Sequence, residues 1–187
     1  MGCSIGVSSS NTLFIAGNPH ADKSAFIAAI QSKLQAHGVE WIALADETTN
    51  GLFDVPRFQA RLTQASTIIL HFPLYWYSPP ALVKQWLDAI LTSGWAFPGA
   101  TSKLRGKTLM LSVTTGSPLS TFQHDGTNGS TLEELLLPLE RTAAYCGMHW
   151  GGIVATHWNT ASADKAALSA NARRHVEALV TRLSARG

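Results

Sequence analysis

TIILHFPLYWYSPPALVKQW, residues 67–86, is the stretch of sequence that decides the fold. Its first six residues form an apolar run rich in β-branched side chains, which is typical of a strand buried on both faces of a sheet. Beyond the proline-rich middle, Leu82, Val83 and Trp86 recur at helical spacing, so the pattern predicts a helix with one buried face. A doubly buried strand followed by such a helix indicates one unit of a parallel α/β sheet.

The same alternation of strand and helix continues in both directions along the chain. The patterns predict further strands at 12–17, 39–44, 107–113 and 151–158, and further helices at 22–38, from residue 56 onward, at 130–147 and at 161–187. We therefore expect an α/β, flavodoxin-like three-layer sandwich, with helices on both faces of a five-stranded parallel sheet in the order 2-1-3-4-5. Residues 12–187 would form this single domain, after a loose N-terminal tail at 1–11. Ser130 and Glu133 predict a capping box at the start of the fourth helix.

Composition argues against several classes of function. Hydrophobic residues make up 45% and charged residues 14% of the 187, as in a globular protein, and no apolar run reaches the roughly 18 residues of a membrane span. A net charge of +2 is too small to indicate nucleic-acid binding. Cys3 and Cys146 form no CxxC pair, and the seven histidines show no metal-ligand spacing. We expect a soluble cytoplasmic protein with no metal site and no nucleic-acid partner.

Three loops should meet at one edge of the predicted sheet. Ligands of open α/β sheets bind at the carboxyl ends of the strands, where the strand order switches, and the loops that follow strands one, three and four are 18–24, 73–80 and 114–130. The first runs into a helix start, where free N–H groups and the Ser24 hydroxyl favour a phosphate. The third begins TTGS, whose small and hydroxylated residues suit the polar edge of a flat ring. Together the loops predict a flavin mononucleotide site.

The middle loop, 73–80, would form the wall of that site. Its three prolines limit backbone freedom, while Tyr75, Trp76 and Tyr77 offer large rigid faces to a planar ligand. Taken alone, such rings more often fill a core or a dimer surface than hold a cofactor. The agreement with two other loops at the same edge favours the cofactor.

Three segments resemble the NAD(P)H quinone oxidoreductase family of flavodoxin-like fold, especially its bacterial branch of ancillary flavoproteins of glutathione-regulated potassium efflux. They are FPLYWYSPPALVKQWLDAILTSGWAF at 72–97, VTTGSPLSTF at 113–122 and AAYCGMHW at 143–150, within a resemblance from about Thr12 to Trp158. The resemblance implies flavin contacts by Asn18, Ser24, Ala25, Phe26, Ile27, Pro73, Leu74, Tyr75, Trp76, Thr114, Thr115, Gly116 and Ser117. It also implies that a hydride passes from NAD(P)H through flavin N5 to a quinone or similar aromatic acceptor, in a ping-pong sequence.

The chain departs from the family pattern at three of these positions and at one further position. Asn18 stands where the family usually has His, Ile27 where it has Asn, and Ser117 where it has Gly. Phe122 stands where many relatives have a Tyr near the hydride-transfer face. Phe122 and His124 are the candidates to line that face, and no residue is assigned firmly as catalytic.

Alternatives remain for the cofactor, the function and the partners. FAD could replace FMN. A flavodoxin-type electron carrier would be expected to show an acidic surface, whereas this chain has a pI near 8.7. A regulatory subunit of a potassium efflux system, in peripheral contact with a membrane transporter, would have secondary or lost reductase activity. Trp95 and Phe97 lie outside any regular pattern and can mark an interface; since relatives are homodimers, we expect a homodimer.

Overall fold

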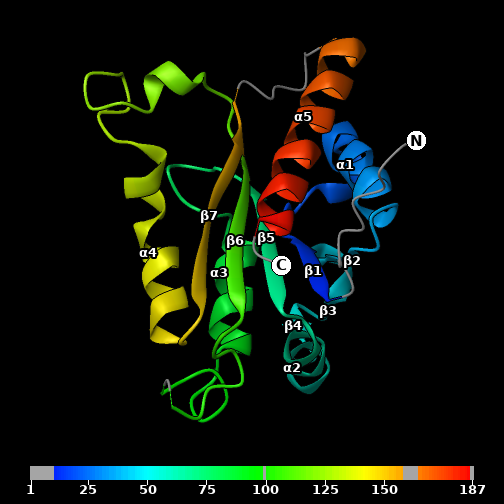
Figure 1. Ribbon diagram of the computed structural model, residues 1–187, viewed down its shortest axis with the longest axis vertical. Helices are drawn as coiled ribbons and strands as arrows, with labels where there is room; N and C mark the ends of the chain where they lie inside the picture. Colours follow the sequence, from blue (N-terminus) through cyan, green and yellow to red (C-terminus); the bar gives the residue numbers. More distant parts are fainter. Residues whose placement is uncertain (1–10, 99, 158–163, 186–187) are drawn as a thin grey trace.

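A computed structural model describes residues 11–98, 100–157 and 164–185 as a three-layer α/β sandwich (Figure 1). All five strands of the central sheet run parallel, in the spatial order β2-β1-β5-β6-β7. The strands are β1 (Thr12–Ala16), β2 (Glu40–Ala43), β5 (Thr67–Pro73), β6 (Thr108–Thr114) and β7 (His149–Thr156). The predicted fold and strand order, 2-1-3-4-5 along the chain, are confirmed. Nearly all of the predicted tail, 1–11, lies outside the described residues.

Helices cover both faces of this sheet and bury two separate cores. One face carries α1 (Ala25–Gln35) and α5 (Lys165–Ser184), and the other carries α2 (Val55–Gln64), α3 (Ala81–Ile90) and α4 (Leu132–Tyr145) (Figure 1). Successive residues of a strand point to opposite faces, so Phe14 and Ala16 enter the core under α1 and α5 while Leu13 and Ile15 enter the other. The apolar runs of the sequence therefore reflect burial on both sides.

A short antiparallel hairpin that the sequence did not predict follows β2. It consists of β3 (Thr48–Thr49) and β4 (Leu52–Phe53), joined by Asn50 and Gly51, whose φ values of 52° and 76° suit a tight two-residue turn. Phe53 is buried against Phe58 of α2, with ring centroids 5.7 Å apart. The hairpin thus covers one end of the larger core.

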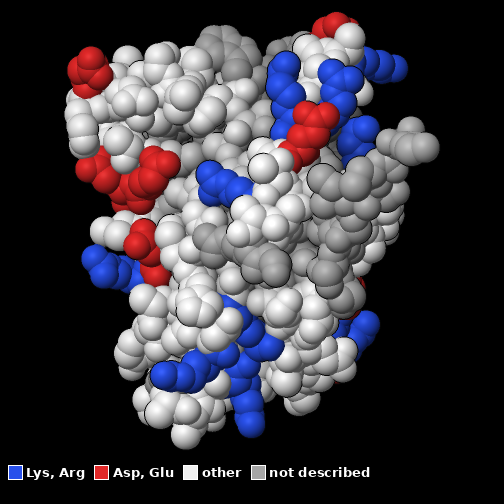
Figure 2. Space-filling view, viewed as in Figure 1, with Lys and Arg blue, Asp and Glu red and all other residues white. Residues whose placement is uncertain are grey.

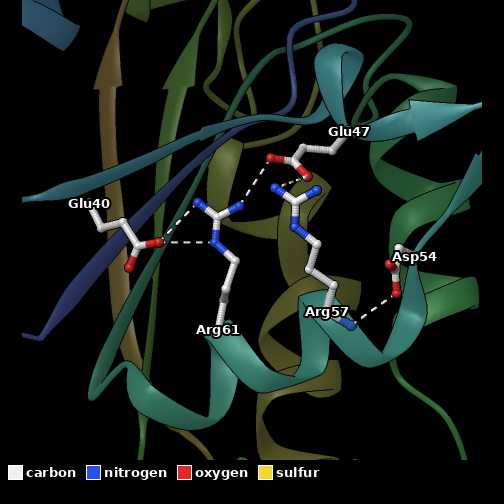
Figure 3. Close-up of polar contacts among 5 residues, drawn as sticks. All are labelled: Glu40, Glu47, Asp54, Arg57 and Arg61. Carbon is white, nitrogen blue, oxygen red and sulfur yellow. Dashed lines mark hydrogen bonds and ion pairs between the residues drawn. The ribbon is translucent and has the colours of Figure 1, made fainter.

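An ionic cluster fixes α2 to β2 and to the turn that follows β2 (Figure 3). The Arg61 guanidinium donates to Oε1 of Glu40 at 2.9 Å and to Oε1 of Glu47 at 3.0 Å, so it joins β2 to the turn after it. Arg57 also approaches Glu47, at 3.7 Å, and its backbone N–H donates to Asp54, which caps the helix. The cluster extends from the N-cap of α2 at Asp54 to its last turn, where Arg61 meets the first residue of β2.

The capping box of α4 lies one residue later than predicted. Thr131 Oγ1 accepts from the Glu134 N–H at 3.2 Å, and a Glu134 carboxylate oxygen accepts from the Thr131 N–H at 2.9 Å. The predicted capping box at Ser130 and Glu133 is therefore wrong. The sequence could not separate the two registers, because Thr131 and Glu134 are as suitable for a capping box as Ser130 and Glu133. Among the described helices none is long and apolar enough to cross a membrane.

Basic side chains gather at the end of the molecule opposite the predicted site (Figure 2). Lys103, Arg105 and Lys107 lie in the turn that leads into β6, hence at the amino edge of the sheet. The Lys107 ammonium donates to the carbonyls of Thr63 and Ala65, at 2.7 and 2.6 Å, and so closes the end of α2. This turn has a structural role.

Candidate functional site

The carboxyl edge of the sheet holds a cavity of about 490 Å³ formed by the three predicted loops. Its described lining comprises Asn18, His20, Lys23, Ser24, Ala25, Phe26, Pro73, Leu74, Tyr75, Thr114, Thr115, Gly116 and Leu168. Ten of the predicted cofactor contacts are in this set. The volume falls within the range of small-molecule sites. We call this space the first cavity.

A close approach between β1 and β5 shapes the floor of the first loop. The Gly17 N–H donates to the His71 carbonyl at 2.6 Å. A Cβ on Gly17 would overlap the side chain of Val83 on α3, so only glycine fits at this point. The chain can then turn from β1 into the short 3-10 helix η1 (Ala21–Lys23) directly beside the sheet edge.

One corner of the first cavity is suited to an anion. Ser24 caps α1, and its Oγ accepts from the Ile27 N–H at 3.3 Å. The other unpaired N–H groups at this helix start and the helix dipole favour negative charge. Lys23 and His20 also line the cavity, although the sequence pattern did not indicate them, while its described lining contains no carboxylate. The corner is therefore net positive.

Two departures from the family pattern take different positions here. The Asn18 side chain accepts from the His20 N–H at 2.9 Å, so it orders the turn that brings His20 to the cavity. Ile27 is 3% exposed and packs in the core under α1 and α5. The side chain of Ile27 therefore acts in packing, and only its N–H reaches the corner, through Ser24.

The predicted aromatic wall is a strained two-residue turn. Tyr75 and Ser78 exchange two backbone hydrogen bonds, at 2.9 and 3.0 Å, and the residues between them, Trp76 and Tyr77, have φ values of 47° and 64°. Such values suit Asn and Gly rather than large aromatic residues. The Trp76 side chain is 93% exposed. Backbone strain of this kind tends to persist where function requires the geometry.

A second, smaller cavity of about 210 Å³ adjoins the first. It is lined by Leu74, Trp76, Tyr77, Thr115, Gly116, Ser117, Phe122 and Asn128, three of which also line the first cavity. None of these side chains carries a charge at neutral pH. The second cavity therefore suits an uncharged ligand, placed beside whatever occupies the first.

The two candidates for the hydride-transfer face separate in the structure. Phe122 is buried and lines the second cavity. His124 is largely exposed and turns toward Glu134 on α4, with 3.7 Å between its Nε2 and a carboxylate oxygen. His124 is therefore not among the described residues that line either cavity.

The loop 114–117 is clamped to β7. The Thr115 N–H donates to the Thr156 carbonyl at 3.0 Å, and Thr115 Oγ1 donates to the Ser117 carbonyl at 2.7 Å. Since that hydroxyl has one hydrogen, the bond of 3.0 Å between Thr115 Oγ1 and His157 must use an Nδ1–H of the histidine as the donor. Burial lowers the pKa of His157, against the opposing effect of Glu133, so the ring is neutral. The clamp fixes the loop geometry beside both cavities.

A buried polar chain supports the sheet below the site. His71 Nδ1 lies 2.8 Å from Ser112 Oγ, which lies 2.7 Å from Nε2 of His175, whose Nδ1 lies 2.8 Å from Thr156 Oγ1. Burial lowers the pKa of His71 to about 3 and that of His175 to about 4. Both rings are thus neutral and have a structural role, since they join β5, β6, β7 and α5.

Among the described residues no group of His, Cys, Asp and Glu could hold a metal ion.

Comparisons with known proteins agree with this architecture. Residues 10–179 match the family model described as flavodoxin-like fold. The NAD(P)H oxidoreductase YrkL of Bacillus subtilis is 37% identical over 140 residues, covering 74% of this chain and 80% of that protein. KefG of Shigella flexneri, an ancillary protein of a glutathione-regulated potassium-efflux system, is 37% identical over 134 residues, covering 72% and 73%.

Two solved structures extend the likeness over nearly the whole chain. General stress protein 14 of Treponema denticola, in complex with FMN, is 29% identical, with a TM-score of 0.83 over 92% of this chain and 99% of that one. An NADPH-quinone reductase from P. pentosaceus is 30% identical, with a TM-score of 0.78 over 90% and 96%.

Proposed function

This chain belongs to the flavodoxin-like family of NAD(P)H oxidoreductases, and we propose that it is an FMN-dependent NAD(P)H:quinone oxidoreductase. The observation that carries this proposal is the pair of adjoining cavities, one with a net positive corner at a helix start and one uncharged and partly aromatic. A phosphate-bearing planar cofactor matches the first cavity, and a neutral acceptor matches the second. A solved relative in complex with FMN supports the choice of cofactor.

The residues of the first cavity fit FMN group by group. The phosphate would lie at the start of α1, where Ser24, Lys23 and backbone N–H groups supply donors and positive charge. The isoalloxazine ring would lie between the turn at Tyr75 and the loop 114–117, with its polar edge toward Thr115 and Gly116. A single phosphate corner within about 490 Å³ favours FMN over the longer FAD.

The chain's own residues would bind the cofactor, orient it and shield the reaction from water. A flavin bound there would supply the redox chemistry, which is hydride transfer from NAD(P)H to the acceptor. The clamp from β7 holds Thr115 and Ser117 rigid, and Phe122 with Leu74 keeps water from the inner side of the second cavity. Nicotinamide and acceptor would use this cavity in turn. Solvent at its open rim, beside the exposed Trp76, would supply the proton that completes reduction of the acceptor.

We also propose that two copies of the chain associate through α3 and α4. A groove of about 810 Å³ runs between these helices, and its lining includes Leu87, Leu91 and Phe97 together with Asp88 and Arg141. Apolar surface with charges of both signs can pair with a copy of itself across a two-fold axis. Of the two aromatic residues that the sequence marks as interface candidates, Phe97 lines this groove, and both Trp95 and Phe97 are half-buried against the core.

Exposed Tyr145 at the end of α4 is the sensitive position for this interface. It lines the groove and its ring centroid lies 5.3 Å from that of Phe97. We expect Tyr145→Glu to convert a dimer to a monomer in light scattering after size-exclusion chromatography. A wild-type monomer at micromolar concentration would rule out the interface.

A regulatory role beside a potassium efflux system is the second candidate function. It is favoured by the identity with KefG, at 37% over 134 residues. On this alternative the same flavin site would report the redox state to a membrane transporter, with reductase activity secondary. Retention of the purified protein by membranes that contain such a transporter, and not by membranes that lack it, would support this role.

The test of the main proposal is the visible absorption spectrum of the purified protein supplied with FMN under anaerobic conditions. We expect the bound flavin to bleach with NAD(P)H and to recover its absorbance with 1,4-naphthoquinone. Ser24→Ala should weaken FMN binding about tenfold, because it removes a donor at the phosphate corner. Ser32→Ala, an exposed serine-to-alanine change on the same helix, is the matched control and should have no effect. Absence of bound flavin in the wild type would refute the proposal.

A further inference from the structure

The second cavity contains one side-chain amide, that of Asn128, which neither the sequence pattern nor the family resemblance indicated. We propose that the second cavity is the acceptor site and that the Asn128 amide donates a hydrogen bond to an oxygen of a neutral planar acceptor, with a one- or two-ring quinone as the committed class. This inference rests on the proposed function and adds to it the residue that orients the second substrate.

The direction in which Asn128 points its amide follows from its neighbours. Thr121 Oγ1 lies 2.8 Å from the Pro118 carbonyl, which can only accept, so the single hydroxyl hydrogen of Thr121 is used there. The bond of 3.0 Å between Thr121 Oγ1 and Asn128 must therefore use an N–H of the Asn128 amide as donor. This assignment fixes the amide nitrogen toward Thr121. The second hydrogen on that nitrogen and the amide oxygen remain for a ligand.

The loop that carries Asn128 is held in shape independently of any ligand. The Asn128 N–H donates to the Thr121 carbonyl at 3.1 Å, and the Gly126 N–H donates to the Gln123 carbonyl at 3.0 Å. A Cβ on Gly126 would lie only 2.6 Å from the Ser120 carbonyl oxygen, so the loop closes tightly where glycine permits it. The amide is thus pre-organised, which lowers the entropy lost when a ligand binds.

The lining of the second cavity defines the chemistry of its occupant. Leu74, Phe122 and the Trp76 ring offer flat apolar contact, while hydroxyls, backbone and the Asn128 amide offer hydrogen bonds. An ionised substrate group would be left without a counter-charge there, which is unfavourable in a partly desolvated site. A quinone carries no charge, and its carbonyl oxygens accept hydrogen bonds. The volume of about 210 Å³, open at the exposed Trp76, suits one or two fused rings.

His124, the other polar candidate on this loop, is turned toward Glu134 and does not compete for this role. The Thr121 hydroxyl donates its hydrogen to the Pro118 carbonyl, and the Thr115 hydroxyl donates its hydrogen to the Ser117 carbonyl. Trp76, Tyr77 and Ser117 also carry donor groups in this lining, but among the described lining residues the spare N–H of Asn128 is the one held in direction by a hydrogen bond of its own side chain.

The experiment measures binding of 1,4-naphthoquinone to the FMN-supplied protein by calorimetry, with no reductant present so that nothing turns over. Asn128→Leu keeps the approximate size of the side chain and removes the donor. We expect it to weaken quinone binding about tenfold, the loss typical of one hydrogen bond, while the dissociation constant of FMN stays within about twofold. Gln123→Leu, an exposed amide on the same loop, is the matched control and should change neither value.

A second variant guards against a folding defect. Asn128→Asp is nearly isosteric and, once ionised, cannot donate, so it should weaken quinone binding at least as much. Circular dichroism confirms that each variant is folded. Unchanged quinone affinity in a folded Asn128→Asp protein would overturn the inference, even if flavin reduction by NAD(P)H proceeds as proposed.

The remaining outcomes separate the inference from the proposed function. A tenfold loss of FMN affinity in Asn128→Leu, with quinone binding unchanged, would assign the amide to the cofactor and overturn the inference. If the wild type retains no flavin, the same quinone titration on the flavin-free protein decides whether the acceptor site exists without the cofactor. Binding that depends on Asn128 would then keep the acceptor site while the reductase proposal fails, and absence of binding would overturn both.

Discussion

The strained turn at Trp76 offers a stability prediction that runs against intuition, because replacing a large aromatic residue should stabilise the protein. Trp76 has a φ of 47°, a conformation that an L-residue with a bulky side chain adopts at a cost of about 1–2 kcal/mol. Asn tolerates this region far better, and an Asn at this position is common in two-residue hairpin turns. We therefore expect Trp76→Asn to raise the free energy of unfolding.

The magnitude follows from what the side chain buries. Because Trp76 is 93% exposed, it removes only about 20 Å² from water, worth about 0.4 kcal/mol. Relief of part of the strain exceeds this loss, which leaves a net gain of about 0.5–1 kcal/mol. Tyr77 has a φ of 64° but is only 51% exposed, so Tyr77→Gly would give up about 100 Å² of burial, about 2.5 kcal/mol, and should be net destabilising.

Urea unfolding of the flavin-free protein is the assay. With a denaturant slope of about 2 kcal/mol/M, a gain of 0.5–1 kcal/mol moves the midpoint up by about 0.3–0.5 M. Leu52→Asn, which removes another exposed apolar side chain from a position with an ordinary negative φ, is the control and should give no rise. A midpoint for Trp76→Asn at or below that of the wild type would refute the reasoning. The same substitution should weaken quinone binding, since Trp76 lines the second cavity.

Three other predictions concern charge and capping. Burial lowers the pKa of His71 to about 3 and that of His175 to about 4, against about 6.5 in the unfolded chain. The unfolded chain therefore binds more protons, and the free energy of unfolding should fall by about 2–3 kcal/mol per pH unit as the pH is lowered from about 6 to about 4.5. Urea midpoints that do not change with pH would contradict this. Thr131→Ala should lower the free energy of unfolding by about 1 kcal/mol by removing the N-cap of α4, whereas Ser130→Ala should have no effect in the same assay. Lys23→Met should weaken FMN binding about fivefold without changing riboflavin binding, as measured by flavin fluorescence, and equal losses for both ligands would contradict a phosphate contact.

The sequence predicted the sheet well because its three central strands, β1, β5 and β6, are buried on both faces. Burial of both faces leaves an unbroken apolar run, as in Ile68, Ile69 and Leu70, all at most 2% exposed. The α3 helix was equally clear, since Trp86 falls on the buried side that its spacing indicates, at 3% exposed. Regular periodicity carries this information, and the parallel order then follows from the crossover lengths.

Irregular segments gave weaker signals. The hairpin at 48–53 was not predicted because two-residue strands are too short to show a period, although Asn50-Gly51 is a typical turn dipeptide. Ile27 carries two signals that fit together. Its helical spacing to Ile30 and Leu34 favours burial of the side chain, which the structure shows. The resemblance assigns Ile27 to the phosphate contacts, which stays a prediction, and its backbone N–H lies at the helix start beside Ser24.

The polar residues of the site that were missed share a physical cause. Lys23 and Asn128 reach the two cavities through turns closed by hydrogen bonds to residues three to seven positions away, such as the bond from the Asn128 N–H to the Thr121 carbonyl. Such closure leaves no repeating pattern in a sequence. Their placement nevertheless divides the site electrostatically, with a positive first cavity and an uncharged second one. That division favours an anionic ligand held in place beside a neutral one that exchanges, which is the arrangement a flavin-dependent quinone reductase needs.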